Sequence, residues 1–224
     1  MCGRFTLTVN PAETQETFSN FNFPQQFAPR FNIAPTQPVL AIPNDDQQKA
    51  NFFVWGLIPM WAKDPDIGNR LINARAETLE EKPAFRGSLK YKRCLILADG
   101  FYEWKASPGR KTKIPFFIHM KDRKPFAFAG LWDSWNSSDG SLVKSCTIIT
   151  TVPNELMEII HNRMPVILHP KDYAKWLDPS PQTPDQLKPL LKPFPAELMN
   201  AYPVSTLVNT PANDTPELVV PQNK

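Results

Sequence analysis

Prolines exclude long helices from much of this chain, most severely near its C-terminal end. The sequence contains 25 prolines, and 11 of them lie in the last 55 residues, from Pro170 onward. Each proline removes a backbone hydrogen-bond donor and clashes with the preceding helical turn. We therefore predict that residues 170–224 form a wrapped, extended segment that carries only short helices.

The rest of the chain is dominated by short segments typical of β-strands, rich in β-branched and aromatic residues and bounded by Gly, Pro, Asp or Ser. The expected strands are residues 39–42, 51–57, 93–104, 115–120, 126–132, 145–151, 165–168 and 217–220. Helices are expected at 11–18, 78–86, 153–160, 170–177 and 184–191. Strands outnumber helices and the two do not alternate regularly. This pattern predicts an α+β fold with a curved or barrel-like sheet and peripheral short helices.

Length and composition favour one folded domain. The chain has 224 residues, of which 42% are hydrophobic, and no repeat, flexible linker or break in composition divides it. We expect one domain over residues 1–224. No run approaches the roughly 18 apolar residues of a membrane span, and the N-terminus lacks a signal-peptide pattern. The three cysteines, Cys2, Cys94 and Cys146, lie far apart, which predicts free thiols and a cytoplasmic protein.

Metal and cofactor sites are not indicated by the sequence. It has neither a CxxC nor an HxxxH pattern, and His119, His161 and His169 are not spaced as ligands. Its 8 glycines form no glycine-rich phosphate-binding loop. We therefore expect no metal and no cofactor.

The net charge of +3 is too small to identify a nucleic-acid binder, so the positions of the arginines carry more information. Four pairs share a spacing of two residues: Cys2 and Arg4, Asn73 and Arg75, His161 and Arg163, and Arg30 and Asn32. In extended backbone, residues i and i+2 point to the same side. Guanidinium groups suit phosphate, and four such positions favour a phosphodiester chain over one small carboxylate. Alternatively, these arginines pair with surface acids such as Glu77 or Glu103.

Three polar residues in strand-like sequence are candidates for catalysis. His161 is a candidate because the unperturbed imidazole of histidine, with a pKa near ~6.5, suits proton transfer, although a histidine after an apolar run is often structural. Glu103 lies between Tyr102 and Trp104, whose rings could desolvate its carboxyl, raise its pKa and make it a general acid. In a simple alternating strand it would instead face water. Asn73 could orient a substrate oxygen or cap a turn.

Cys2 allows three interpretations. It can be inert, it can carry a lipid, or it can become the first residue once Met1 is removed. The third would create a 1,2-aminothiol, whose amine condenses with an aldehyde and whose thiol then closes a thiazolidine ring. Ring closure is intramolecular, with effective molarities that can reach ~10⁵ M. The aldehyde found within a phosphodiester chain is the ring-opened abasic site of DNA.

Eight stretches together resemble the SRAP family (SOS response-associated peptidase). They are MCGRF (1–5), PRFNIAPTQ (29–37), WGLIPMWA (55–62), LINARAET (71–78), ADGFYEW (98–104), HNRMPVIL (161–168), YPVSTLVN (202–209) and TPELVVP (215–221). The resemblance implies one compact domain with a β-barrel-like core, removal of the initiator methionine, and a thiazolidine crosslink between the N-terminal cysteine and an abasic site. The implied partner is single-stranded DNA with abasic sites, bound by a monomer in a positively charged groove.

The resemblance also implies a role for each matching residue. Cys2 would form the crosslink, Glu103 would assist Met1 removal and act as acid and base, and Asn73 would position a sugar hydroxyl or a peptide carbonyl. His161 would promote opening of the sugar ring and reversal of the crosslink. The implied DNA contacts are Arg4, Arg75 and Arg163 to phosphate, Arg30 and Asn32 in support, and Trp61, Trp104 and Pro35 as an apolar wedge. Asn162 departs from the family, many members of which carry Asp there, and could alter the orientation of His161.

Two alternatives come from other functional classes. In the first, Cys2, His161 and Glu103 or Asn73 form a thiol peptidase that turns over other proteins. In the second, the chain is a non-covalent module for single-stranded nucleic acid, which would bind equally with and without an abasic site. A basic, hairpin-like loop at 109–113 has no assigned DNA contact.

Overall fold

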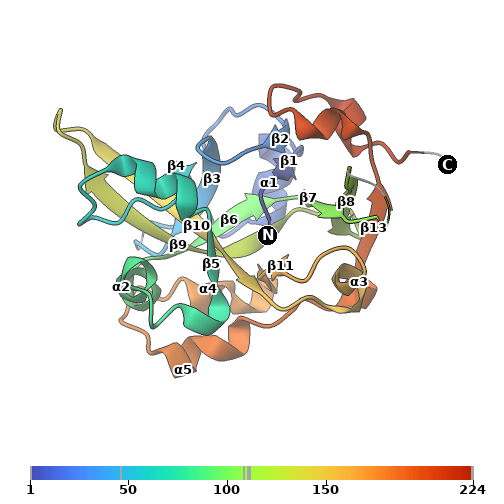
Figure 1. Ribbon diagram of the computed structural model, residues 1–224. Helices are drawn as coiled ribbons and strands as arrows, with labels where there is room; N and C mark the ends of the chain where they lie inside the picture. Colours follow the sequence, from blue (N-terminus) through green and yellow to red (C-terminus); the bar gives the residue numbers. More distant parts are fainter. Residues whose placement is uncertain (1, 46, 108, 110–111, 223–224) are drawn as a thin grey trace.

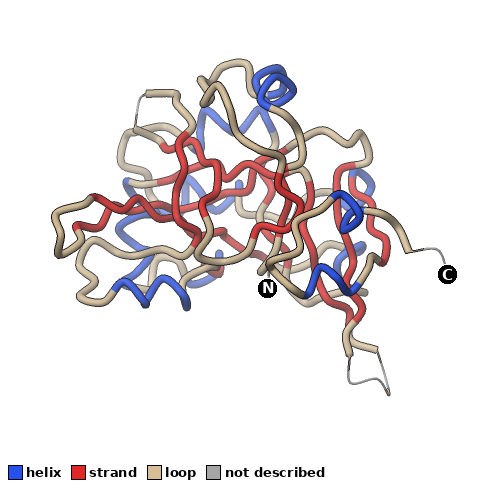
Figure 2. The backbone as a smooth tube through the Cα atoms, turned by 90° about the horizontal axis from the view of Figure 1, so that it is seen from above, coloured by secondary structure: helices blue, strands red, loops and turns tan. Residues whose placement is uncertain are grey.

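The computed structural model describes residues 2–45, 47–107, 109 and 112–222. Expectations for Met1 and for Arg110 and Lys111 of the basic loop therefore concern residues outside this description. Within it, strands occupy the centre of the molecule and helices and loops lie at its periphery (Figures 1 and 2). No helix in the described part of the chain is both long enough and apolar enough to cross a membrane.

Five strands close into a barrel. In order around the ring they are β10 (Leu142–Thr151), β4 (Asn51–Trp55), β3 (Pro38–Pro43), β6 (Arg93–Ala98) and β9 (Phe126–Asn136). The ring closes because β10 pairs in parallel with β4 and antiparallel with β9. Short strands extend it, namely β5 (Asn73–Arg75) and β11 (Met164–Pro165) on β10, and β12 (Ile167–Leu168) on β9. The predicted α+β fold with a barrel-like core is confirmed.

A second sheet carries the start of the chain. Its order is β13 (Met199–Pro203), β8 (Ile114–Met120), β7 (Gly100–Lys105), β1 (Phe5–Leu7) and β2 (Arg30–Ile33). The segment predicted as one strand, 93–104, breaks at Asp99 into β6 of the barrel and β7 of this sheet. The Asp99 carboxylate holds the corner by accepting hydrogen bonds from the Thr6 hydroxyl at 2.5 Å and the Thr8 backbone N–H at 2.6 Å. Gly100 follows, where a Cβ would lie 2.2 Å from the Phe117 ring.

The helices are short, as the prolines predict. They are α1 (Pro11–Thr17), α2 (Pro83–Tyr91), α3 (Glu155–Glu158), α4 (Tyr173–Trp176) and α5 (Pro184–Leu187), with 3₁₀ turns η1 (Pro65–Arg70), η2 (Ala76–Thr78), η3 (Pro170–Asp172), η4 (Lys188–Leu190), η5 (Ala196–Leu198), η6 (Thr206–Asn209) and η7 (Pro216–Val219). The helix predicted at 78–86 begins instead at Pro83, because the fixed φ of proline suits the first helical position. The strand predicted at 217–220 is wrong, since these residues belong to η7, which also starts on a proline.

The two sheets share one core, which fixes the N-terminal strand. Phe5 of β1 packs edge to face against Trp55 of β4 and Phe128 of β9, with ring centroids 5.0 and 5.7 Å away. The C-terminal segment with η6 and η7, red in Figure 1, runs beside β1 and β2. The fold thus brings the last part of the chain next to its first residues.

Candidate active site

Cys2 precedes β1 and is fully buried. The backbone carbonyl of Arg4 accepts a hydrogen bond from the Tyr102 N–H at 2.9 Å, which aligns the N-terminal segment with β7. The Cys2 Sγ lies 3.9 Å from that same carbonyl. Burial raises the pKa of the Cys2 thiol, and the nearby Glu103 carboxylate acts in the same direction. The thiol is therefore neutral in this structure and needs a proton acceptor before it can attack an electrophile.

Asn73 holds the backbone of Cys2. The residue lies on β5, which β10 positions by parallel pairing of Ile148 with Asn73. Its Nδ2 donates a hydrogen bond to the Cys2 carbonyl oxygen at 2.7 Å. Its Oδ1 is buried and has no hydrogen-bond partner among the described residues. The Asn73 amide thus orients Cys2 with one end and presents an acceptor with the other.

Glu103 and His161 face each other across the site. Glu103 Oε2 on β7 lies 4.0 Å from His161 Nε2, in the loop between α3 and β11. The Glu103 side chain is only 3% exposed, and burial raises its pKa although the charge of His161 opposes this shift. His161 Nδ1 lies 3.1 Å from the Arg163 backbone nitrogen, from which it can accept a hydrogen bond, and 3.3 Å from the Arg163 carbonyl oxygen, to which it can donate one. The accepting form carries the ring proton on Nε2, the atom nearest Glu103. This pair can exchange protons beside Cys2.

The arginines predicted to contact phosphate differ in their exposure and in their ion-pair partners. Arg75 on β5 is exposed. Arg163 makes a bidentate ion pair with Glu77, at 2.7 and 2.9 Å, and also donates to the Thr150 carbonyl at 2.6 Å. Pairing with a surface acid, the alternative considered for these arginines, therefore describes Arg163 in this structure. It also describes Arg30, whose Nε lies 2.5 Å from the Asp214 carboxylate.

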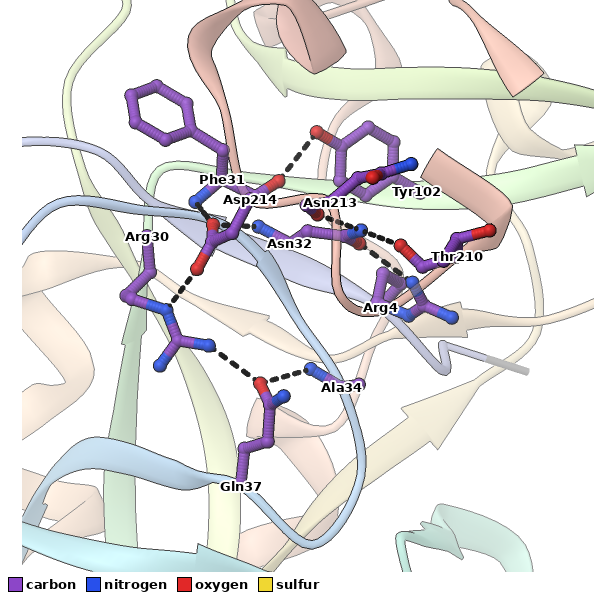
Figure 3. Close-up of polar contacts among 10 residues, drawn as sticks. All are labelled: Arg4, Arg30, Phe31, Asn32, Ala34, Gln37, Tyr102, Thr210, Asn213 and Asp214. Atoms are coloured by element: carbon purple, nitrogen blue, oxygen red, sulfur yellow. Dashed lines mark hydrogen bonds and ion pairs between the residues drawn. The ribbon is translucent and has the colours of Figure 1, made fainter. Parts of the chain in front are cut away.

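Arg4 and Asn32 are joined to the C-terminal segment rather than left open to solvent (Figure 3). Arg4 Nη1 donates to Asn32 Oδ1 and to the Val208 carbonyl, each at 2.8 Å. The Asn32 side chain is completely buried, and its Nδ2 donates to the carbonyls of Thr210 at 3.1 Å and Asn213 at 2.6 Å. Asn32 therefore supports Arg4 from inside the protein.

The three predicted wedge residues lie on separate loops and strands. Trp61 is 56% exposed, and its loop is fixed by a hydrogen bond from the Met60 N–H to Asp133 Oδ2 at 2.9 Å. Trp104 is half-buried and donates to Asn209 Oδ1 at 2.8 Å. Pro35 is half-buried beside Thr36, which has a φ of +70°. These residues present apolar surface on rigid supports.

Several partners in the site have no local signal in the sequence. Glu77 lies 86 positions from Arg163, and Asp214 lies 184 positions from Arg30. The stretches YPVSTLVN and TPELVVP resemble the family, but neither that resemblance nor any spacing gives Val208, Asn209 or Asp214 a role.

Neither a cavity of about 450 Å³ nor a cluster of metal ligands among the described residues marks this site. The cavity is lined by residues of the α1–β2 and β3–β4 loops and of 170–179, and none of the predicted site residues lines it. No group of three or more His, Cys, Asp or Glu side chains in the described ranges could hold a metal ion. Cys2, Cys94 and Cys146 are free and buried.

Comparison with known proteins identifies the family. The family model "SOS response associated peptidase (SRAP)" matches residues 1–211. "Abasic site processing protein YoqW" of Bacillus subtilis (strain 168) is 51% identical over 98% of this chain and 99% of that protein. "Abasic site processing protein HMCES" of Gallus gallus is 34% identical over 88% of this chain and 67% of that protein. A crystal structure of a Bacteroides thetaiotaomicron protein matches with a TM-score of 0.88 at 28% identity, covering 99% of this chain and 100% of that one. This chain belongs to the SRAP family.

Proposed function

We propose that this protein recognises abasic sites in single-stranded DNA and becomes covalently linked to them through Cys2 after Met1 has been removed. The names of the relatives YoqW and HMCES, abasic site processing proteins, support the lesion as the substrate. The observation that carries the chemistry is that Cys2, Asn73 and the Glu103–His161 pair come from separate parts of the chain and converge at its N-terminus.

The proposed maturation step is hydrolysis of the Met1–Cys2 peptide bond. Water adds to the Met1 carbonyl, the C–N bond breaks, and methionine leaves as a free acid. Glu103 accepts a proton from the water and passes it to the Cys2 nitrogen, which becomes the new α-amine. Asn73 supports this step by holding the Cys2 carbonyl at 2.7 Å.

The proposed crosslinking step joins this amine and the thiol to one aldehyde carbon. His161 Nε2–H assists opening of the sugar ring, and the amine adds to the aldehyde. Glu103, whose pKa burial raises, acts as the general acid: in its protonated form it donates a proton to the departing hydroxyl, so that water leaves and a protonated imine forms. The resulting carboxylate accepts the thiol proton, which restores the Glu103 acid. Sulfur then bonds to the carbon of the protonated imine, and the proton already on nitrogen stays there as the ring N–H. The balance is one water released per thiazolidine.

The test is a denaturing gel of protein mixed with a single-stranded oligonucleotide that carries one abasic site. We expect a heat-resistant protein–DNA band that is absent with an undamaged oligonucleotide and with Cys2→Ala. Cys146→Ala, which removes another buried thiol, is the matched control and should still give the band. A band with undamaged DNA, or none with the abasic oligonucleotide, contradicts the proposal. Equal retention of both oligonucleotides without any covalent band would indicate a non-covalent binding module.

A further inference from the structure

The carboxylate of Asp214 lies where the C-terminal segment meets β2 (Figure 3). Its Oδ2 accepts from Arg30 Nε at 2.5 Å, and its Oδ1 accepts from the backbone N–H groups of Phe31 at 2.5 Å and Asn32 at 2.9 Å. One side chain thus binds three successive residues of a strand that lies more than 180 positions away in the sequence. Asp214 also lies beyond residue 211, where the family match ends.

The first connection from Asp214 leads to Arg4. Asn32, whose N–H Asp214 holds, donates its side-chain amide to the Thr210 and Asn213 carbonyls. The carbonyl end of that amide and the Val208 carbonyl together bind Arg4 Nη1. β2 and the C-terminal segment therefore orient the Arg4 guanidinium together. We expect this orientation to be lost if the two elements separate.

The second connection leads to the turn that contains Pro35. Arg30 Nη2 donates to Gln37 Oε1 at 2.7 Å, and the same oxygen accepts from the Ala34 N–H at 3.1 Å. This bridge closes the turn 34–37, in which Thr36 has a φ of +70°. The ion pair with Asp214 directs the Arg30 guanidinium into this bridge and away from a phosphate.

We propose that Asp214 is a positioning residue for DNA binding, one that aims the Arg4 guanidinium at phosphate and fixes the Pro35 turn. The inference rests on the proposed binding of single-stranded DNA. It gives Arg30 and Asn32 supporting roles within the protein in place of direct contacts with DNA.

A rival role for Asp214 is inhibition, in which its carboxylate mimics a phosphate on Arg30 and is displaced by DNA. The geometry favours positioning, because Asp214 also binds two backbone N–H groups of β2, the edge strand of its sheet. The segment is also held by Trp104, which donates to Asn209, and by Asn32, which donates to Asn213. The two roles predict opposite changes in DNA affinity when the Asp214 side chain is removed. Removal of an inhibitor strengthens DNA binding, whereas removal of a positioning residue weakens it.

The experiment compares Asp214→Ala with Glu217→Ala, which removes an exposed carboxylate from the same segment. Binding of an undamaged single-stranded oligonucleotide is measured by fluorescence anisotropy at several salt concentrations. Loss of one aimed phosphate contact should reduce the slope of log K against log salt by about 0.7 in Asp214→Ala, with no change in Glu217→Ala. In crosslinking assays the half-saturating concentration of abasic DNA should rise several-fold, while the maximal rate stays within about twofold.

Three results would overturn the inference: tighter binding by Asp214→Ala, a slope equal to that of Glu217→Ala, or an equal further loss of slope in an Arg4→Ala background. If Asp214→Ala does not fold, Asp214→Asn, which keeps one acceptor oxygen, is judged by the same slope. Failure of the wild-type protein to crosslink would contradict the proposed function alone, since the slope is measured with undamaged DNA. Failure of the wild type to bind undamaged DNA would overturn both.

Discussion

Glu103 and Glu77 show how the surroundings of a carboxyl set its chemistry. Burial raises the pKa of Glu103, so its proton is retained to higher pH than in water. Glu77 is 47% exposed, and its hydrogen bonds from Arg163 lower its pKa, so it stays an anion. Of these two carboxyls, only Glu103 has its pKa shifted in the direction that favours a proton donor.

Replacing Glu103 by Gln should separate catalysis from stability. We expect crosslinking to slow by about 10²-fold or more, because the acid that assists loss of water is gone. Burial makes the pKa of Glu103 higher in the folded than in the unfolded protein. The free energy of unfolding of the wild type therefore falls as the pH rises from the unfolded-state pKa of this carboxyl through its folded-state pKa. Glu103→Gln should therefore have a higher Tm than wild type at neutral pH and no such advantage below about pH 4.

The control for this prediction is Glu16→Gln, an exposed glutamate on α1. It should change neither the crosslinking rate nor the difference in Tm between the two pH values. A lower Tm for Glu103→Gln at neutral pH would mean that the contacts of the carboxylate outweigh the cost of burying it.

The sequence suggested candidate residues for the site but not most of the partners that the fold gives them. The spacing of two residues led us to expect the Arg4 guanidinium beside Cys2, but the contact that Cys2 Sγ makes is with the Arg4 backbone carbonyl, and the guanidinium binds Asn32 and the Val208 carbonyl. It could not indicate that Arg163 and Arg30 are neutralised by acids far away in the chain, because only the closed fold brings those acids near. Charge partners of this kind depend on tertiary structure.

At the scale of elements, most of each long strand was predicted, whereas several short strands were missed. β9 and β10 span 11 and 10 residues, and most of each was predicted. β1 and β5 have 3 residues each, too few to display an alternating pattern, yet they carry the neighbours of Cys2 and Asn73 itself. The corner at Asp99 was missed because both flanking strands are buried and read as one apolar run.

The ion pair between η2 and the loop before β11 gives a prediction at this scale. In Glu77→Gln, Arg163 can bind a phosphate without first releasing a carboxylate, so the affinity for single-stranded DNA should rise. Because a surface ion pair is worth less than about 1 kcal/mol, the increase should be at most about fivefold. The Thr150 carbonyl still holds the guanidinium in place. The free energy of unfolding, measured in urea, should change by less than about 1 kcal/mol.

Glu80→Gln is the matched control for Glu77→Gln. Glu80 pairs with Lys188 and is 45% exposed, so this change removes the same charge without touching Arg163. Its DNA affinity should stay near wild type. Weaker binding by Glu77→Gln would show that Glu77 aims Arg163 at DNA instead of competing with DNA for it.

At the scale of the whole molecule, the proposed DNA binding depends on where the cationic side chains lie and not on the total charge. The net charge is only +3, so long-range attraction to DNA is small. The wrapped C-terminal segment was predicted from its prolines, but its contacts with Arg4 and Trp104 were not, because proline content determines what a segment cannot form and says nothing about where it docks. Binding should therefore depend on a few positioned guanidiniums.

This dependence predicts the salt sensitivity of binding. Three phosphate contacts, from Arg4, Arg75 and Arg163, should give a slope of log K against log salt of about −2 on single-stranded DNA, since each contributes about 0.7. Arg75 is exposed, so Arg75→Ala should remove one contact without disturbing the core and bring the slope to about −1.4. Lys175→Ala, on exposed α4 surface, should leave the slope unchanged. If Arg75→Ala and Lys175→Ala reduced the magnitude of the slope equally, binding would depend on the total charge of the protein, because only a positioned contact makes one cation contribute more than another.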